Sequence, residues 1–294
     1  MNRLFVVGDS FSADNLVQGD PYKAWYRQTA DKLNLKCDNH SLIGSSQDWC
    51  WWKLAQNITE LTPQDQIMVV ITHPGRFWFF DDKPQMTNYQ ILNIDDELNQ
   101  EQLDAVKKFI MHVQRPPLDI QMQSHRLGWL DAQIRLHKLK PAQVVCAFPI
   151  FIQEQFNFKE HVNWLNYENI HVSKGDLISI ERREYTEGTD ENKLWQGYDC
   201  RYNHLIKQNH EVLSDLLVEA IKNNTSVDLT QYDKFTSNLI DYSVFDNEEF
   251  CREHFDQFVV QERKSFLEKN VTQEEPWAKR SGLLDFWNSK RKAK

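Results

Sequence analysis

The sequence predicts an α/β fold, in which a mostly parallel sheet is covered by helices on both faces. The first observation is a set of short apolar runs typical of buried strands, and the second is that segments with helical spacing lie between them. Strand followed by helix, repeated along a chain, favours parallel strands joined by right-handed crossovers. The apolar runs are Leu4–Val7, Ile67–Ile71 and Val144–Phe148.

Local signals predict the elements between these strands. Asp20-Pro21 is typical of a helix start, because aspartate caps free amide groups and proline suits the first helical position. Pro116-Pro117 is expected to close the helix that precedes it. Apolar spacing predicts helices near residues 48–58, 103–113, 120–138 and 203–221, and short strands at 170–172 and 177–180.

Composition is that of a soluble globular protein. The 294 residues are 40% hydrophobic and carry a net charge of −9, so we expect neither nucleic acid nor anionic membrane as a partner. The N-terminus lacks the long apolar region of a signal peptide, which favours a cytoplasmic location. Five cysteines lie far apart, which indicates free thiols rather than disulfides or a zinc cluster, and no cofactor or metal is expected.

The character of the chain changes after Asn223-Asn224. We therefore expect one domain at 1–224 and a helical extension at 225–294, with an amphipathic helix at 247–270. The tail at 271–294 combines aromatic and leucine residues with a basic end. Such a segment is typical of a peptide that docks on a protein partner, although it could instead pack back on its own domain.

The tripeptide Gly8-Asp9-Ser10 directly follows the first predicted strand. In open α/β sheets the functional site lies outside the carboxyl ends of the strands, so Ser10 is expected at the mouth of such a site. A serine hydroxyl needs a histidine base to act as a nucleophile, and His204 is the candidate, with Asp199 to orient it. The structural alternatives are a Ser10 that only caps a turn and a His204 that only packs at the start of its helix.

Three blocks of the chain resemble the SGNH (GDSL-type) hydrolases, most closely their bacteriophage-like variants. They are Gly8–Ser12, Gly44–Gln47 and His204–His210, and the resemblance covers residues 1–224. It implies a three-layer α/β/α sandwich with a flavodoxin-like sheet. It also implies that Ser10 is the nucleophile, that His204 is the base, and that the amides of Ser10 and Gly44 bind the oxyanion.

Two departures from the family pattern concern the site itself. The family usually carries an acid three residues before its histidine, where this chain has Arg201, so Asp199 would have to act or the pair would work as a dyad. The family's oxyanion asparagine is missing from Thr72–Arg76, and His73 or Arg76 is the candidate replacement.

The function expected from the resemblance is that of a serine esterase acting on small acyl esters, for example O-acetyl groups on a polysaccharide. The alternative is a catalytically weak or inactive hydrolase scaffold that serves as a structural or interaction protein, for example in a phage particle. The altered third block and the aromatic tail favour this alternative, whereas a reactive Ser10 would disfavour it.

Overall fold

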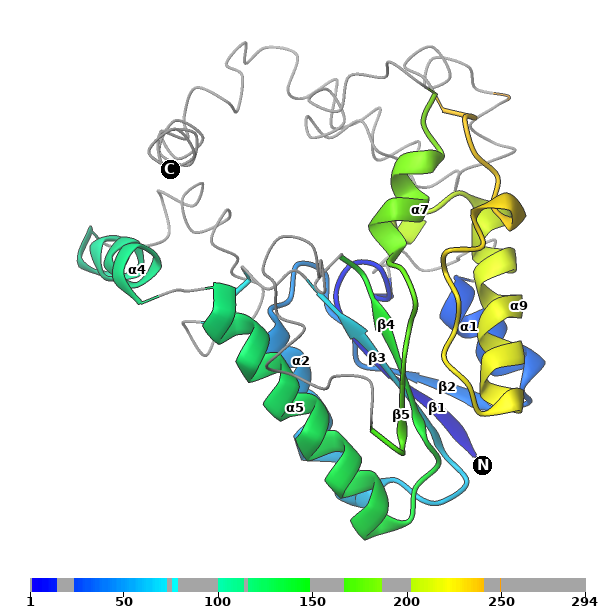
Figure 1. Ribbon diagram of the computed structural model, residues 1–294, viewed down its shortest axis with the longest axis horizontal. Helices are drawn as coiled ribbons and strands as arrows, with labels where there is room; N and C mark the ends of the chain where they lie inside the picture. Colours follow the sequence, from blue (N-terminus) through cyan, green and yellow to red (C-terminus); the bar gives the residue numbers. More distant parts are fainter. Residues whose placement is uncertain are drawn as a thin grey trace.

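The computed structural model describes residues 2–14, 24–72, 76–78, 100–113, 116–148, 167–186, 202–240 and 249. These residues confirm the predicted α/β class, with one all-parallel sheet and helices on both of its faces (Figure 1). The described strands are β1 (Arg3–Val7), β2 (Lys36–Asn39), β3 (Gln66–Ile71), β4 (Ala142–Cys146) and β5 (Ile170–Val172).

The order of the strands across the sheet is β2-β1-β3-β4-β5, which is the flavodoxin-like order. From β1 the chain first crosses to β2 on one side and then returns past β1 to β3 on the other. The register pairs Val7 with Val69, so the carboxyl ends of β1 and β3 lie side by side. This reversal in strand order is the switch point at which ligands bind in open α/β sheets.

Two helical layers cover the sheet. Helices α1 (Trp25–Lys32), α7 (Leu177–Arg183) and α9 (Lys207–Asn223) pack on one face, and α2 (Gln47–Asn57) and α5 (Pro116–His137) pack on the other. Alternate residues of each strand enter the two cores, which explains why the strands read as continuous apolar runs. From β1, the first core receives Leu4 and Val6, and the second receives Phe5 and Val7.

Smaller elements complete the described part of the chain. Helix α4 (Gln100–His112) stands apart from the sheet in Figure 1. Three short 3-10 helices are η1 (Ile58–Glu60), η4 (Tyr202–His204) and η5 (Tyr232–Lys234). Packing on the first face continues past residue 224. Residues of this later segment that enter the first core are Val227, Leu229 and Phe235.

The structure corrects three local predictions. Residues 177–180 form a helix rather than a strand, because the Asp176 carboxylate caps the amide of Ser179 at 2.8 Å and Leu177 and Ile180 face the core one helical turn apart. Pro116-Pro117 begins α5 instead of closing α4, since a first turn needs no proline N–H.

The third correction concerns the helix expected from residue 203. It begins at Lys207, so His204 lies in the turn before it rather than in the helix. The predicted helix start at Asp20-Pro21, the helix at 247–270 and the tail at 271–294 lie outside the described residues. The division of the chain at residue 224 stays a prediction.

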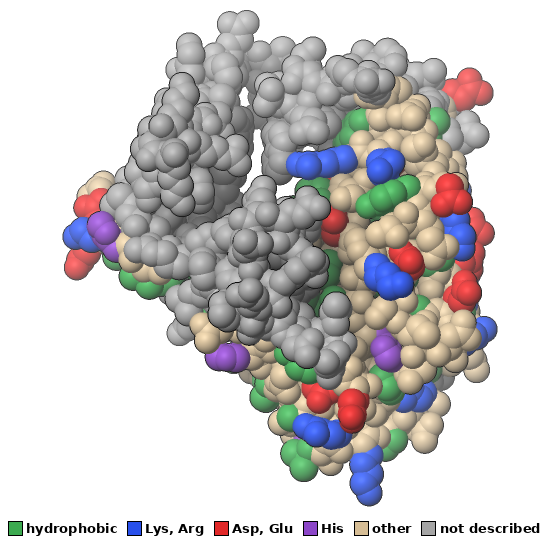
Figure 2. All heavy atoms as spheres, viewed as in Figure 1, with side chains coloured by type: hydrophobic (Ala, Val, Ile, Leu, Met, Phe, Trp, Pro, Cys, Tyr) green, Lys and Arg blue, Asp and Glu red, His purple; other side chains and the backbone are tan. Residues whose placement is uncertain are grey.

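Two features concern possible partners: the distribution of charged side chains on the surface, and the length and apolar character of the helices. In the view of Figure 2, the described side chains of both charge signs are interspersed over the face. Within the described residues, no helix has the length and apolar character needed to cross a membrane.

Candidate active site

Gly8 brings the end of β1 into close contact with β3. A Cβ atom at this position would lie 2.5 Å from the Cβ of Val70 and 2.4 Å from the Oγ of Ser12, so only glycine fits. The Gly8 carbonyl accepts hydrogen bonds from the Ser45 hydroxyl at 2.9 Å and from the Leu42 amide at 3.0 Å. The exit of β1 is thereby tied to the loop that follows β2.

Asp9 is fully buried and fixes the turn that carries Ser10. One carboxylate oxygen accepts from the Phe11 amide at 3.1 Å. The other accepts from the Thr72 hydroxyl and, at 2.9 Å, from a terminal nitrogen of Arg76. Asp9 therefore links the exits of β1 and β3. The predicted oxyanion donor Arg76 contacts Asp9 through this nitrogen, and its oxyanion role stays a prediction.

The structure brings Ser10 and His204 together across the long interval of sequence that separates them. The Ser10 Oγ lies 2.8 Å from the His204 Nε2, a hydrogen-bond distance. The Phe11 ring stacks on the imidazole, with 4.5 Å between ring centroids. A histidine nitrogen at this distance can take the proton of a serine hydroxyl, which is what a serine needs to act as a nucleophile.

The turn that carries His204 has an unusual backbone. Asn203 and His204 both have positive φ angles, 49° and 64°, which asparagine tolerates better than most residues. The Asn203 side-chain amide donates to the carbonyls of Ser10 at 2.6 Å and Ala13 at 2.9 Å. Backbone strain of this kind costs on the order of 1–3 kcal/mol per residue and persists only where the surroundings enforce it. Here the enforcing contacts run directly to the loop of Ser10.

A carboxylate that the sequence analysis missed lies behind the imidazole. Glu181 Oε1 is 3.6 Å from the Nδ1 of His204, within ion-pair distance. Asp199 lies outside the described residues, so its orienting role stays a prediction. Glu181 was missed because residues 177–180 read as a strand. An available signal was Asp176, a capping residue ahead of apolar residues spaced as in a helix.

Glu184, also fully buried, connects α7 to the start of α9. Its carboxylate oxygens accept from the Ile206 amide at 3.1 and 3.2 Å, and one accepts from the Asn209 side chain at 2.7 Å. Ile206 is the N-terminal cap position of α9 and makes no side-chain cap of its own, so Glu184 supplies an acceptor there. Glu181 lies three residues before Glu184, and His204 lies two residues before Ile206. The bonds that Glu184 accepts from Ile206 and Asn209 therefore keep Glu181 close to His204.

The loop after β2 forms the remaining wall. Gly44 adopts a positive φ of 71°, and Ser46 caps α2 by accepting from the Trp49 amide at 3.2 Å. The side-chain oxygen of Gln47 accepts from the Thr72 amide at 2.8 Å. The amides of Ser10 and Gly44 thus follow neighbouring strands, and their role as oxyanion donors stays a prediction. His73 lies outside the described residues.

Two comparisons of the chain with known proteins identify no relative. A scan against models of known protein families matches none of them, and a search of curated proteins finds no match. Among the described residues, no three His, Cys, Asp or Glu side chains are grouped so that they could hold a metal ion. The resemblance to SGNH hydrolases therefore rests on the sequence blocks and stays a prediction.

Proposed function

We propose that the protein is a serine hydrolase of the SGNH type that cleaves small acyl esters. The observation that carries the proposal is the 2.8 Å contact between Ser10 Oγ and His204 Nε2, at the carboxyl edge of a flavodoxin-like sheet. These two residues come from the two sequence blocks that most closely resemble the family. Their contact supports a hydrolase over an inactive scaffold, since a scaffold needs no serine aligned with a base.

In the first half of the reaction, Ser10 Oγ attacks the acyl carbonyl carbon while His204 Nε2 takes the hydroxyl proton. The carbonyl oxygen becomes an oxyanion. When the tetrahedral intermediate collapses, the bond to the alcohol oxygen breaks, and the alcohol leaves with the proton from His204. The acyl group remains on Ser10 as an ester.

In the second half, water replaces the alcohol. His204 Nε2 takes a proton from the water as its oxygen attacks the acyl-enzyme, and returns a proton to Ser10 Oγ as the carboxylic acid leaves. Both halves pass through an imidazolium. Glu181 faces the opposite nitrogen, Nδ1, where a carboxylate favours the Nδ1–H tautomer and stabilises this cation. We therefore propose that Glu181 orients His204, and the role of Asp199 remains a separate prediction.

The test is turnover of p-nitrophenyl acetate, together with covalent labelling by a fluorophosphonate probe. The wild-type protein should hydrolyse the ester and take up one probe, on Ser10. Ser10→Ala and His204→Ala should each reduce kcat by on the order of 10⁵–10⁶, because residues that act as a unit fail together. O-acetylated polysaccharide is the natural substrate class to try next.

Asn57→Ala is a matched control, because Asn57 ends α2 and its side chain caps only the carbonyl of Lys53. It should leave turnover and labelling as in the wild type. A wild-type protein that neither turns over the ester nor takes up the probe, while folded by circular dichroism, would remove the hydrolase proposal. The inactive interaction protein would then be the better reading.

A further inference from the structure

An oxyanion needs hydrogen-bond donors that are already in place when its charge develops, and each such donor is worth about 10²–10³ in kcat. The chain lacks an asparagine in the segment after β3, Thr72–Arg76. The described hydrogen bonds of Arg76 come from one terminal nitrogen, which donates to Asp9 and Thr72, and its guanidinium lies over the Phe148 ring. The question is which other side chain carries a spare donor at the switch point. This inference rests on the proposed function.

Gln47 carries such a donor. Its side chain is 4% exposed, and its oxygen accepts from the Thr72 amide at 2.8 Å. Because a backbone N–H can only donate, this bond fixes which end of the side-chain amide is oxygen and which is nitrogen. The nitrogen, Nε2, is buried and has no hydrogen-bond partner. A buried donor without a partner is costly, and such a group in a native structure calls for a ligand or water.

The position of Gln47 connects this donor to Ser10. Gln47 is the first residue of α2, three residues after Gly44, and the positive end of the helix dipole lies there. Its partner Thr72 also bonds to Asp9, which is the residue before Ser10. The chain of contacts Gln47, Thr72, Asp9 therefore runs from α2 across the exit of β3 to the loop of Ser10.

Other buried atoms without partners do not combine these properties. In the described part of the chain they are Trp51 Nε1, Gln123 Nε2, Gln143 Oε1 and Asn203 Oδ1. Two of the four are acceptors, which would repel an oxyanion. The two donors belong to the second turn of α2 and to α5, and neither residue has a described hydrogen bond to the strand exits.

We infer that Gln47 Nε2 donates a hydrogen bond to the oxyanion, in the place that the family gives to an asparagine. Gln47 is then a catalytic residue, and its side-chain oxygen has a second task, because the bond from Thr72 holds the amide in position. The donor is anchored to β3 while its own backbone belongs to α2. An asparagine in the segment after β3 is not needed in this arrangement.

The experiment compares Gln47→Glu and Gln47→Met with the wild type in p-nitrophenyl acetate hydrolysis and in the rate of fluorophosphonate labelling. Glutamate keeps the length and the acceptor for Thr72 but removes the donor. Methionine removes the donor without adding charge. We expect kcat to fall about 100-fold in both, with KM unchanged, because the bond forms only as the charge develops. Labelling by the probe should slow in parallel.

Gln143→Met is the matched control, since Gln143 is a buried glutamine on β4 with one bonded and one unbonded amide atom. It should change stability but not kcat of the folded protein. Circular dichroism melts give the folded fraction of each variant. If either Gln47 variant is folded and keeps the wild-type kcat, or if kcat falls only in proportion to the folded fraction, the inference is overturned. A wild-type protein without turnover or labelling would instead remove the proposed function, a distinct result.

Discussion

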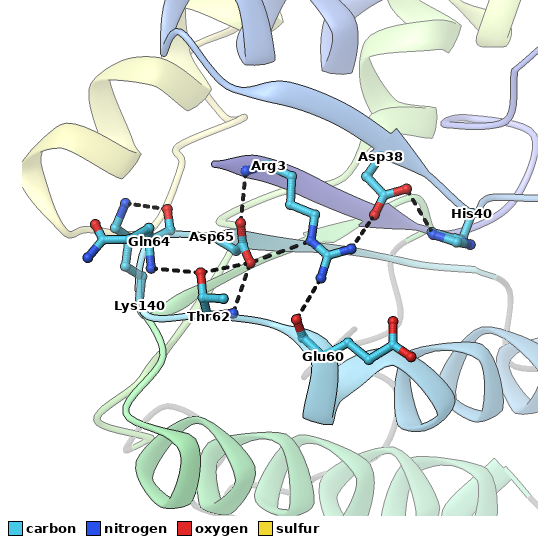
Figure 3. A network of polar contacts seen from close by, with 8 residues as sticks. All are labelled: Arg3, Asp38, His40, Glu60, Thr62, Gln64, Asp65 and Lys140. Atoms are coloured by element: carbon cyan, nitrogen blue, oxygen red, sulfur yellow. Dashed lines mark hydrogen bonds and ion pairs between the residues drawn. The ribbon is translucent and has the colours of Figure 1, made fainter. Parts of the chain in front are cut away.

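Two aspartates at opposite edges of the sheet are held by the same kinds of group, yet they serve different ends. Asp65, before β3, accepts from Arg3 and Thr62 at the amino edge (Figure 3). Asp9, after β1, accepts from Arg76 and Thr72 at the carboxyl edge. Each carboxylate also receives at least one backbone amide. The two aspartates differ in the groups that surround them.

At the amino edge the polar groups close on one another. Arg3 reaches from Asp65 to Asp38 at 3.0 Å and to the carbonyl of Glu60 at 2.7 Å, and Lys140 donates to the carbonyl of Gln64 at 2.9 Å. The network joins the starts of β1, β3 and β4 to Asp38 of β2, and the loop before β4 has a single positive φ at Lys138. We call this network of Arg3, Asp38, Asp65 and Lys140 the brace. Within the described residues, all of its contacts join one part of the fold to another.

At the carboxyl edge the similar group of side chains stops next to Ser10. The hydroxyl of Ser10 faces an imidazole on a turn with two consecutive positive φ angles. Strain and a buried donor without a partner, Gln47 Nε2, both occur here. The comparison teaches that an Asp–Thr–Arg cluster is a structural device at either edge. The feature specific to the carboxyl edge is the contact between Ser10 and His204, on a turn with two consecutive positive φ angles.

The largest effect on turnover at the carboxyl edge is expected when Glu181 is replaced. In Glu181→Gln the charge behind His204 is lost and the wrong tautomer is favoured, so kcat should fall by on the order of 10²–10³ with the melting temperature little changed. Steady-state hydrolysis of p-nitrophenyl acetate measures it. Asp199→Asn is the matched comparison, and it should keep the wild-type kcat if Glu181 alone orients His204. The reverse result, with Asp199→Asn inactive and Glu181→Gln active, would return the orienting role to Asp199.

The next effect concerns the free energy of unfolding. It compares Gly8, where a side chain does not fit, with Gly128, where one does. Gly8→Ala should lower the free energy of unfolding by about 3 kcal/mol, because the new Cβ would lie 2.5 Å from the Cβ of Val70 on β3 and force the strands apart. Gly128→Ala on α5 is the control. Its Cβ would meet only the Tyr167 ring at 3.8 Å, and alanine favours the helix, so stability should rise by about 0.5–1 kcal/mol. Urea unfolding would show the contrast, and equal effects of the two substitutions would contradict it.

A smaller effect tests the brace at the amino edge. Burial by itself would raise the pKa of Asp65, but hydrogen bonds from Thr62 and Arg3 outweigh it and lower the pKa below its ordinary value. The charged carboxylate therefore stabilises the fold above the unfolded pKa of about 3.9, and this contribution is lost as pH falls through the folded pKa. Asp65→Asn should lower the free energy of unfolding by about 2 kcal/mol at pH 7.

Urea unfolding at several pH values checks this prediction. The difference between wild type and Asp65→Asn should narrow as the pH falls below about 4. Turnover by the folded variant should equal that of the wild type, since the brace lies at the other edge of the sheet. Asp38→Asn, at the half-exposed end of the same network, should cost less than about 1 kcal/mol. A pH-independent loss for Asp65→Asn would show that shape, not charge, matters there.

The smallest effect is expected at the thiols. Burial raises the pKa of Cys37, Cys50 and Cys146 to about 12 each, so almost no thiolate forms at neutral pH. Iodoacetamide at pH 8 should leave these three thiols unmodified in the native protein and modify all of them in urea, as read by peptide mass spectrometry. Ser10 would then be the activated nucleophile beside three silent ones. Rapid alkylation of any of the three would contradict this.

Much of the fold could be predicted because its signals are local. The run that became β1, the turn at Gly8 and the helix near 48–58, found as Gln47–Asn57, each depend on a few adjacent residues. The strand at Ile170–Val172 was also predicted. The prediction failed at residues 177–180, where a short apolar run fits a strand or a helix equally well. The capping bond of Asp176 decides between them.

The candidate site could be predicted only in part, for the same physical reason. By itself the sequence determined that a strand ends just before Ser10, that Gly8 lies in the turn after it, and that the block at His204 resembles SGNH hydrolases. Backbone sterics and short motifs act over a few residues, so these features can be recognised locally. The sequence led us to expect Ser10 beside His204, and the structure supplies their contact. Tertiary structure alone decided that Glu181 lies behind the imidazole and that Gln47 bonds to Thr72. Contacts between residues far apart in the chain depend on strand order and crossovers, which bring the ends of separate elements to one edge of the sheet.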